Sequence, residues 1–169
     1  LMTVHVPQEL LQKLDKPGPR YTSYPTVPAW STDFTDQEWL AALDEFAADP
    51  QRETSLYVHL PYCVKRCHYC GCNAAVPDNR TDVDRYLDHL ERELDLQVAH
   101  VGRRKVIQMH WGGGTPNFQT EAQLRRTWSL MAQRFDLDGE MSLECDPRAA
   151  RPEQVALLRE VGFNRISMG

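Results

Sequence analysis

The chain has 169 residues, a formal net charge of −5 and the composition of an ordinary globular protein, enough for one domain with a buried core. The acidic balance argues against a nucleic-acid binder, and no apolar run approaches the roughly 20 residues that a membrane-spanning helix needs. Residues 1–14 lack the basic and apolar regions of a secretory signal, so we expect a cytoplasmic protein with no nucleic-acid or membrane partner.

Residues 1–54 are predicted to form an N-terminal extension, with an irregular segment followed by one helix. Prolines at positions 17, 19, 25 and 28 interrupt regular structure in the first 34 residues. Thr35 and Glu38 then form a capping box, which predicts the start of a helix that ends before Pro50. The apolar face of this helix is predicted to hold Trp39, Leu40, Leu43, Phe46 and Ala47.

From residue 55 onward, strand and helix patterns alternate. Strands are predicted at 55–60, 105–111, 140–145 and 164–168. Helices are predicted at 82–100, after the capping box of Thr120 and Gln123, and at 152–161. This order implies parallel strands that are joined by right-handed crossovers.

The predicted strands alternate between apolar and polar residues. The apolar positions are Leu56, Val58, Leu60, Ile107, Met109, Trp111, Met141, Leu143, Cys145, Ile166 and Met168. The polar positions are Tyr57, His59, Gln108, His110, Ser142, Glu144, Arg165 and Ser167. A parallel sheet that helices cover on both faces would instead have nearly continuous apolar strands.

The alternation favours a barrel with a polar interior over its alternative, an open sheet with one solvated face. Four strands cannot close a barrel. We therefore predict an α/β fold, an incomplete parallel (β/α) barrel with the first four strands of a partial TIM-like barrel. Residues 55–169 would form its first part, truncated at Gly169.

Four of the five cysteines lie between residues 63 and 72, directly after the first predicted strand. Chemistry in (β/α) barrels takes place at this end of the strands. Cys63, Cys67 and Cys70 have C-x3-C-x2-C spacing on one short loop, which favours an iron–sulfur cluster with one thiolate on each of three corners. The alternative is a structural zinc site, although zinc sites usually join two separated pairs of ligands.

This spacing, with the aromatic Tyr69 before the third cysteine, resembles the signature of the radical S-adenosylmethionine (SAM) superfamily. Two further stretches, residues 18–26 and residues 70–73 (Cys-Gly-Cys-Asn), are similar to the oxygen-independent coproporphyrinogen III oxidases within it. The resemblance implies a radical SAM barrel and a 4Fe–4S cluster whose fourth iron binds SAM. Cys72 would then lie near the cluster without binding it, and we expect Cys145 in the core.

The resemblance also implies which residues bind SAM. Gly112–Gly113–Gly114 would let backbone approach the methionine end, and Glu144 would bind the ribose. Tyr57 would line the same site, and its alternative is a core tyrosine. A second SAM molecule would contact Tyr69, Gly114 and Thr115.

The function that the resemblance implies is decarboxylation of two propionates of coproporphyrinogen III to vinyl groups, which gives protoporphyrinogen IX in haem biosynthesis. The partners would be this substrate and an unidentified electron donor and acceptor, and the protein would be a monomer. Arg20 would pair either with a substrate propionate or with a structural carboxylate. The alternatives for the whole protein are a radical SAM haem chaperone and a zinc-stabilised binding module. We expect the 169 residues alone to have little oxidase activity.

Overall fold

The computed structural model describes residues 7–15 and 26–169, in two compact units that divide after Thr35. The first unit contains helix α1 (Gln8–Leu14) and a single 3-10 turn, η1 (Val27–Ala29). The prediction of an irregular segment is wrong for α1, because this run has neither proline nor glycine and consists of good helix formers. Arg20 and the other residues of 18–25 lie outside the described residues.

The second unit is built on a four-stranded parallel sheet. Its strands, which pair in sequence order, are β1 (Thr54–Leu60), β2 (Lys105–Gly113), β3 (Asp136–Cys145) and β4 (Arg165–Met168). The helices that connect them are α3 (Thr81–Val101), α4 (Glu121–Arg134) and α5 (Pro152–Val161). The predicted alternation of strands and helices is confirmed.

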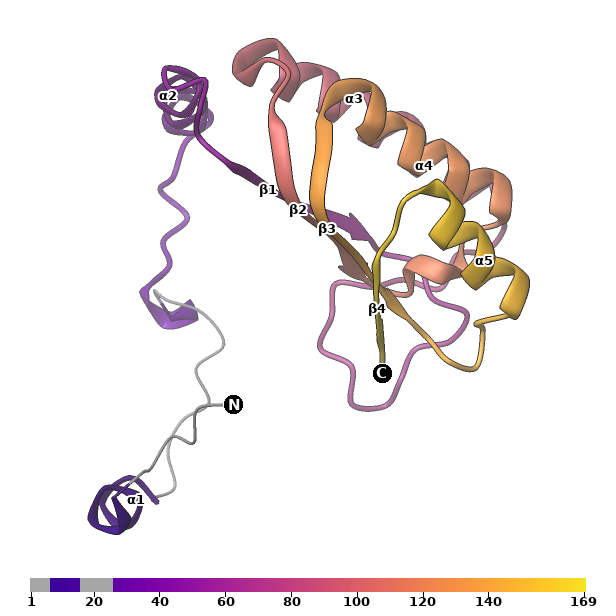
Figure 1. Cartoon of the computed structure of the whole chain (residues 1–169), viewed down its shortest axis with the longest axis horizontal. Helices are drawn as coiled ribbons and strands as arrows, with labels where there is room; N and C mark the ends of the chain where they lie inside the picture. Colours follow the sequence, from indigo (N-terminus) through magenta and orange to yellow (C-terminus); the bar gives the residue numbers. More distant parts are fainter. Residues whose placement is uncertain (1–6, 16–25) are drawn as a thin grey trace. The chain divides into compact units, whose positions relative to one another are not determined.

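The strand order identifies the sheet as part of a barrel. In a doubly wound sheet the order reverses partway, which sends helices to both faces. Here the order β1-β2-β3-β4 does not reverse, and α3, α4 and α5 cover the same face (Figure 1). Successive right-handed crossovers wrap such a sheet with its helices outside. The four strands therefore form an arc of a (β/α) barrel, and its uncovered face is the inner one.

The helix-covered face of the sheet holds the core. Trp111 is fully buried, and its ring meets the Phe163 ring edge-on with centroids 4.7 Å apart. Burial of each large apolar side chain stabilises the fold by about 2 kcal/mol. Other buried core residues are Val58, Leu60, Met109, Leu124, Met131, Leu143, Leu157 and Leu158.

The predicted alternation is wrong at two positions. Val106 is buried in β2 in place of Ile107, because the pairing of β2 with both neighbours shifts register between Val106 and Gln108. A bulge of this kind reverses the direction of the side chains that precede it. Met168 is 59% exposed, since β4 is the edge strand of the described sheet.

Helix α2 (Asp36–Ala47) belongs to the sheet unit, whereas the sequence places it in the extension. It packs against α3. The buried guanidinium of Arg104 donates hydrogen bonds to the carbonyl oxygens of Ala47 and Asp49 at 2.7 and 2.6 Å. These contacts place the division after Thr35 rather than after residue 54.

The start of one connecting helix follows the sequence. Helix α4 starts at its predicted capping box. The Gln123 backbone amide donates to Thr120 Oγ1 at 3.2 Å, and the Thr120 backbone amide donates to the side-chain Oε1 of Gln123 at 3.0 Å. Among the described helices, none is both long and apolar enough to cross a bilayer.

Candidate functional site

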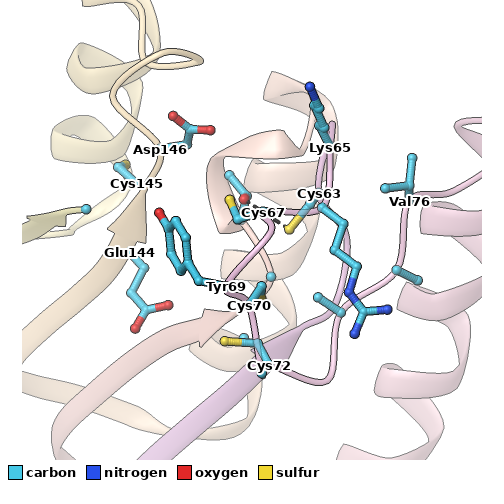
Figure 2. Close-up of a pocket in the computed structure, with 18 of the residues that line it drawn as sticks. Cys63, Lys65, Cys67, Tyr69, Cys70, Cys72, Val76, Glu144, Cys145 and Asp146 are labelled. Carbon is cyan, nitrogen blue, oxygen red and sulfur yellow. Dashed lines mark hydrogen bonds between the residues drawn. The ribbon is translucent and has the colours of Figure 1, made fainter.

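A cavity of about 370 Å³ lies at the carboxyl ends of the strands, between the loop after β1 and the ends of β2 and β3 (Figure 2). In parallel strands these ends share one edge of the sheet, so residues far apart in sequence meet here. The predicted site residues that line the cavity are Cys63, Cys67, Tyr69, Cys70, Gly113, Gly114, Thr115 and Glu144. Tyr57 lies outside the lining, on β1.

Backbone pairing closes the base of the cysteine loop. Tyr62 and Ala75 form a parallel bridge, and the Cys63 amide donates to the Ala75 carbonyl at 3.0 Å. The Ala75 amide donates in turn to the Pro61 carbonyl at 2.8 Å. The ends of the loop are thus tied together, and the three predicted ligand cysteines lie within the closed segment.

The glycine run joins this loop to β2 and does so with its own backbone. The Gly114 amide donates to the Leu60 carbonyl, and the Thr115 amide to the Tyr62 carbonyl, both at 2.9 Å. A Cβ on Gly114 would lie 2.7 Å from the carbonyl carbon of Pro61. The Gly114 amide is therefore used by the carbonyl of Leu60 and is not free to bind a ligand.

The hydroxyl of Thr115 contacts one of the predicted ligand thiols. Thr115 Oγ1 donates to Cys63 Sγ at 3.3 Å. The hydrogen bond of the Cys72 thiol to Cys70 is the main cause that raises the pKa of Cys72. Such contacts orient metal ligands and tune the electron density on their sulfur atoms.

The donor set fits an iron–sulfur cluster better than a single ion. All five cysteines are free thiols, and the three on the loop are partly exposed to the cavity. In the described part of the chain, no three His, Cys, Asp or Glu side chains are grouped closely enough to hold one metal ion. Thiolates on separate corners of a cubane lie further apart than thiolates around one zinc.

Cys145 differs from the loop cysteines because it is buried in the core at the end of β3. Its side chain is 3% exposed, and burial raises the pKa of its thiol to about 11. A thiol of this kind stays protonated and is a poor metal ligand. Cys145 is a core residue, as expected.

Glu144 reaches the cavity from the polar face of β3 (Figure 2). His110 Nε2 lies 3.5 Å from its carboxylate, and His110 Nδ1 lies 2.8 Å from Ser142 Oγ. The sequence analysis assigned His110 no role, although its place on the polar face of β2 was the available signal. The histidine positions Glu144.

Tyr57 lies on the same polar face and is 61% exposed, so the alternative of a core tyrosine is wrong. Its ring stacks on His110 with centroids 6.1 Å apart, and its hydroxyl is 3.3 Å from His59 Nδ1. Partial burial and then the charge of Glu144 raise the pKa of Tyr57. Its hydroxyl therefore remains a hydrogen-bond donor on the polar face of the sheet, where it and Glu144 both lie next to Gly112.

Asp146 and Arg148 complete the wall after β3, and the sequence analysis assigned neither a role in the site. Arg148 Nε donates to Asp146 Oδ1 at 2.9 Å, and Arg148 Nη2 donates to Asp146 Oδ2 at 2.7 Å. This pairing lowers the pKa of Asp146 and raises the pKa of Arg148. Their position directly after a strand was the available signal.

Residues 57–169 match the model of the radical SAM superfamily. The oxygen-independent coproporphyrinogen III oxidase of Escherichia coli (strain K12) is 44% identical over 95% of this chain and 35% of its own length. The protein of that name from Pseudomonas aeruginosa is 38% identical over 100% of this chain and 38% of its own length. The chain therefore spans about a third of the length of these relatives.

Two further similarities cover the site and the fold. A Mannheimia haemolytica protein of the same name is 41% identical over 82% of this chain and 94% of its own length. The solved structure of coproporphyrinogen III oxidase from Escherichia coli, described as a radical SAM enzyme, superposes with a TM-score of 0.81 at 42% identity. It covers 95% of this chain and 36% of the solved chain. The chain belongs to the radical SAM superfamily and, within it, to the oxygen-independent coproporphyrinogen III oxidase family.

Proposed function

We propose that the chain provides the cluster- and SAM-binding part of an enzyme that converts two propionates of coproporphyrinogen III to vinyl groups without oxygen. The observation that carries the proposal is the single loop with the free thiols of Cys63, Cys67 and Cys70, which faces Glu144 across a cavity at the carboxyl ends of the barrel strands. Relatives that share 38–44% of its residues are named for this reaction.

When bound, a 4Fe–4S cluster and SAM would supply an electron and a 5′-deoxyadenosyl radical that removes hydrogen from the substrate. Cys63, Cys67 and Cys70 would hold the cluster. Glu144, held by His110, would accept hydrogen bonds from the SAM ribose hydroxyls, and the Tyr57 hydroxyl would donate at the edge of the same site.

The volume of the cavity is consistent with one bound SAM molecule. A volume of about 370 Å³ is within the range of small-molecule sites, roughly 300–1,000 Å³. Gly113 and Gly114 would lie against this molecule. We propose the second SAM at Tyr69, Gly114 and Thr115, where the 91% exposed Tyr69 ring offers a free aromatic face.

We also propose that the enzyme is a monomer and that it uses an electron donor and an electron acceptor that are not yet identified. Five free thiols, four of them on one loop, suit a reducing compartment such as the cytoplasm. Cys72, which the haem-chaperone branch typically lacks, argues against the chaperone alternative.

Anaerobic reconstitution with iron and sulfide tests the proposal. We expect a brown protein with about four irons per chain that cleaves SAM when reduced. Cys67→Ala should lose the chromophore and at least about tenfold in SAM cleavage, because one corner of the cluster loses its ligand.

Cys145→Ala serves as the matched control, since it removes a thiol from the core and leaves the loop unchanged. It should keep both the chromophore and SAM cleavage. A colourless protein that contains zinc but no sulfide would contradict the proposal.

A further inference from the structure

We propose that Asn117 is a positioning residue that sets the distance between the cysteine loop and Glu144, and with it the fit of the cavity to SAM. The inference rests on the proposed function, because it takes Glu144 as the carboxylate that binds the ribose. It gives a role to the polar side chains that are buried at the 3-10 turn η2 (Pro116–Phe118), which follows the glycine run.

The register between β2 and β3 ends just before Glu144. The last paired residues of these two strands are Trp111 and Leu143, whereas β2 continues to pair with β1 as far as Gly113. Gly113 and Glu144 line the cavity from the two strands, and both lie beyond the last pair. The separation of these two walls therefore depends on contacts outside the sheet ladder.

The Asn117 carboxamide supplies such a contact. Its Oδ1 accepts a hydrogen bond from the Asp146 amide at 2.9 Å, and its Nδ2 donates to the Asp146 carbonyl at 3.2 Å. Asn117 thus pairs with both backbone groups of one residue, as the members of a hydrogen-bonded strand pair do. Asp146 and Glu144 lie on the same wall of the cavity, across from the cysteine loop (Figure 2), so a shift of Asp146 would move Glu144.

The start of the η2 segment is fixed to the cysteine loop. Thr115, two residues before Asn117, donates its hydroxyl to Cys63 Sγ at 3.3 Å. The path from Cys63 through Thr115 and Asn117 to Asp146 therefore connects the two walls of the cavity. Because SAM would contact the cluster at one end and Glu144 at the other, the length of this path sets the span that SAM has to fill.

A second buried amide holds the Asn117 side chain in this orientation. Gln154 Nε2, on α5, donates to the Asn117 carbonyl at 3.0 Å, and Asn117 Nδ2 donates to Gln154 Oε1 at 3.3 Å. Asn117 and Gln154 are 3% and 4% exposed, so water does not compete for these groups. An apolar side chain at position 117 would remove the partner of both backbone groups of Asp146.

Amide hydrogen exchange of the iron-free chain, followed by nuclear magnetic resonance, tests the bridge itself. Asn117→Leu keeps a side chain of similar size but removes both hydrogen bonds to Asp146, so the Asp146 amide should exchange at least about tenfold faster. The Gly114 amide, whose acceptor is the Leu60 carbonyl, should keep its exchange rate. An unchanged rate at Asp146 would overturn the proposal.

The SAM affinity of the anaerobically reconstituted chain tests the consequence for the site. In Asn117→Leu the dissociation constant from equilibrium dialysis should rise about tenfold, which is about 1.4 kcal/mol. The iron and sulfide content should equal that of the unaltered chain, because the three ligand cysteines are untouched. An unchanged dissociation constant would overturn the proposal. If Asn117→Leu does not fold, the same measurements on Asn117→Ser decide, because the shorter side chain cannot bridge both backbone groups of Asp146.

Thr127→Val is the matched control, because Thr127 is fully buried in the same polar layer on α4. Its hydroxyl hydrogen-bonds to the Gln123 carbonyl at 2.9 Å and to Gln119 Oε1 at 3.2 Å. This variant should lower the unfolding midpoint and leave the SAM affinity unchanged. Equal losses of SAM affinity in Thr127→Val and Asn117→Leu would show a purely structural role and overturn the proposal. A failure of the proposed function looks different, because the unaltered chain would then form no cluster.

Discussion

Backbone packing at single residues sets the shape of the cysteine loop. Gly114 touches Pro61 and Tyr62 so closely that any side chain would collide with main-chain atoms, which cannot rotate away. Gly113 adopts a φ of 110°, a conformation that favours glycine. The end of β2 therefore supports the loop that holds the three thiols, in addition to lining the cavity.

Gly114→Ala should lower the free energy of unfolding by about 2 kcal/mol, because the added Cβ would lie 2.7 Å from the Pro61 carbonyl carbon. The displaced loop should also bind less iron after reconstitution. Urea unfolding and iron analysis measure the two effects.

Gly71→Ala is the control for this change, since a Cβ there meets nothing within 4 Å although Gly71 lies between Cys70 and Cys72. It should change the free energy of unfolding by less than about 0.5 kcal/mol. Equal effects of the two substitutions would refute the assignment of Gly114 to close packing.

At the scale of elements, the bulge in β2 decides which of two adjacent residues enters the core. Val106 is 0% exposed, while Ile107 is only partly buried, although Ile107 carries the larger apolar side chain. The register shift between Val106 and Gln108 occurs against both β1 and β3. The middle of β2 then resumes the alternation that sends His110 to the polar face.

Val106→Ala should cost about 2 kcal/mol of unfolding free energy, because it leaves a cavity in the core. Ile107→Ala, which removes more carbon atoms, should cost less because its side chain is already in partial contact with water. Denaturant titration of both variants measures the two losses of unfolding free energy. A larger loss for Ile107→Ala would show that Ile107, and not Val106, is the core residue, as the regular alternation predicts.

At the scale of the molecule, the sheet unit begins at Asp36 and includes α2. Arg104 is 6% exposed and relies on α2 and the turn after it for two of its hydrogen-bond acceptors. The Arg104 guanidinium also lies 5.2 Å from the Phe46 ring. A buried cation that loses such partners is costly.

Deletion of residues 1–35 should therefore leave the unfolding midpoint of the sheet unit unchanged. Deletion of residues 1–53 should destabilise this unit by about 2 kcal/mol, because Arg104 loses the Ala47 and Asp49 carbonyls. Thermal and urea unfolding of the two shortened chains distinguish a boundary at residue 35 from one at residue 54. If the two shortened chains were equally stable, the boundary would lie at residue 54.

Much of the fold and most of the candidate site were predictable from the sequence, because their signals are local. The period of apolar residues predicts each strand and crossover helix, and the spacing of Cys63, Cys67 and Cys70 predicts a cluster loop. The positions of the glycines, Glu144 and the loop cysteines at or directly after the carboxyl ends of strands were also sufficient to predict that they meet at one edge.

Long-range contacts decided the rest, since no local pattern encodes them. The bulge at Val106 depends on pairing with two neighbouring strands, and the place of α2 depends on acceptors for Arg104. The contact between Thr115 and Cys63 joins loops that are 52 residues apart in sequence. The sequence by itself determined the elements and the ligand types, while tertiary packing determined their partners, because partners are chosen by distance in space.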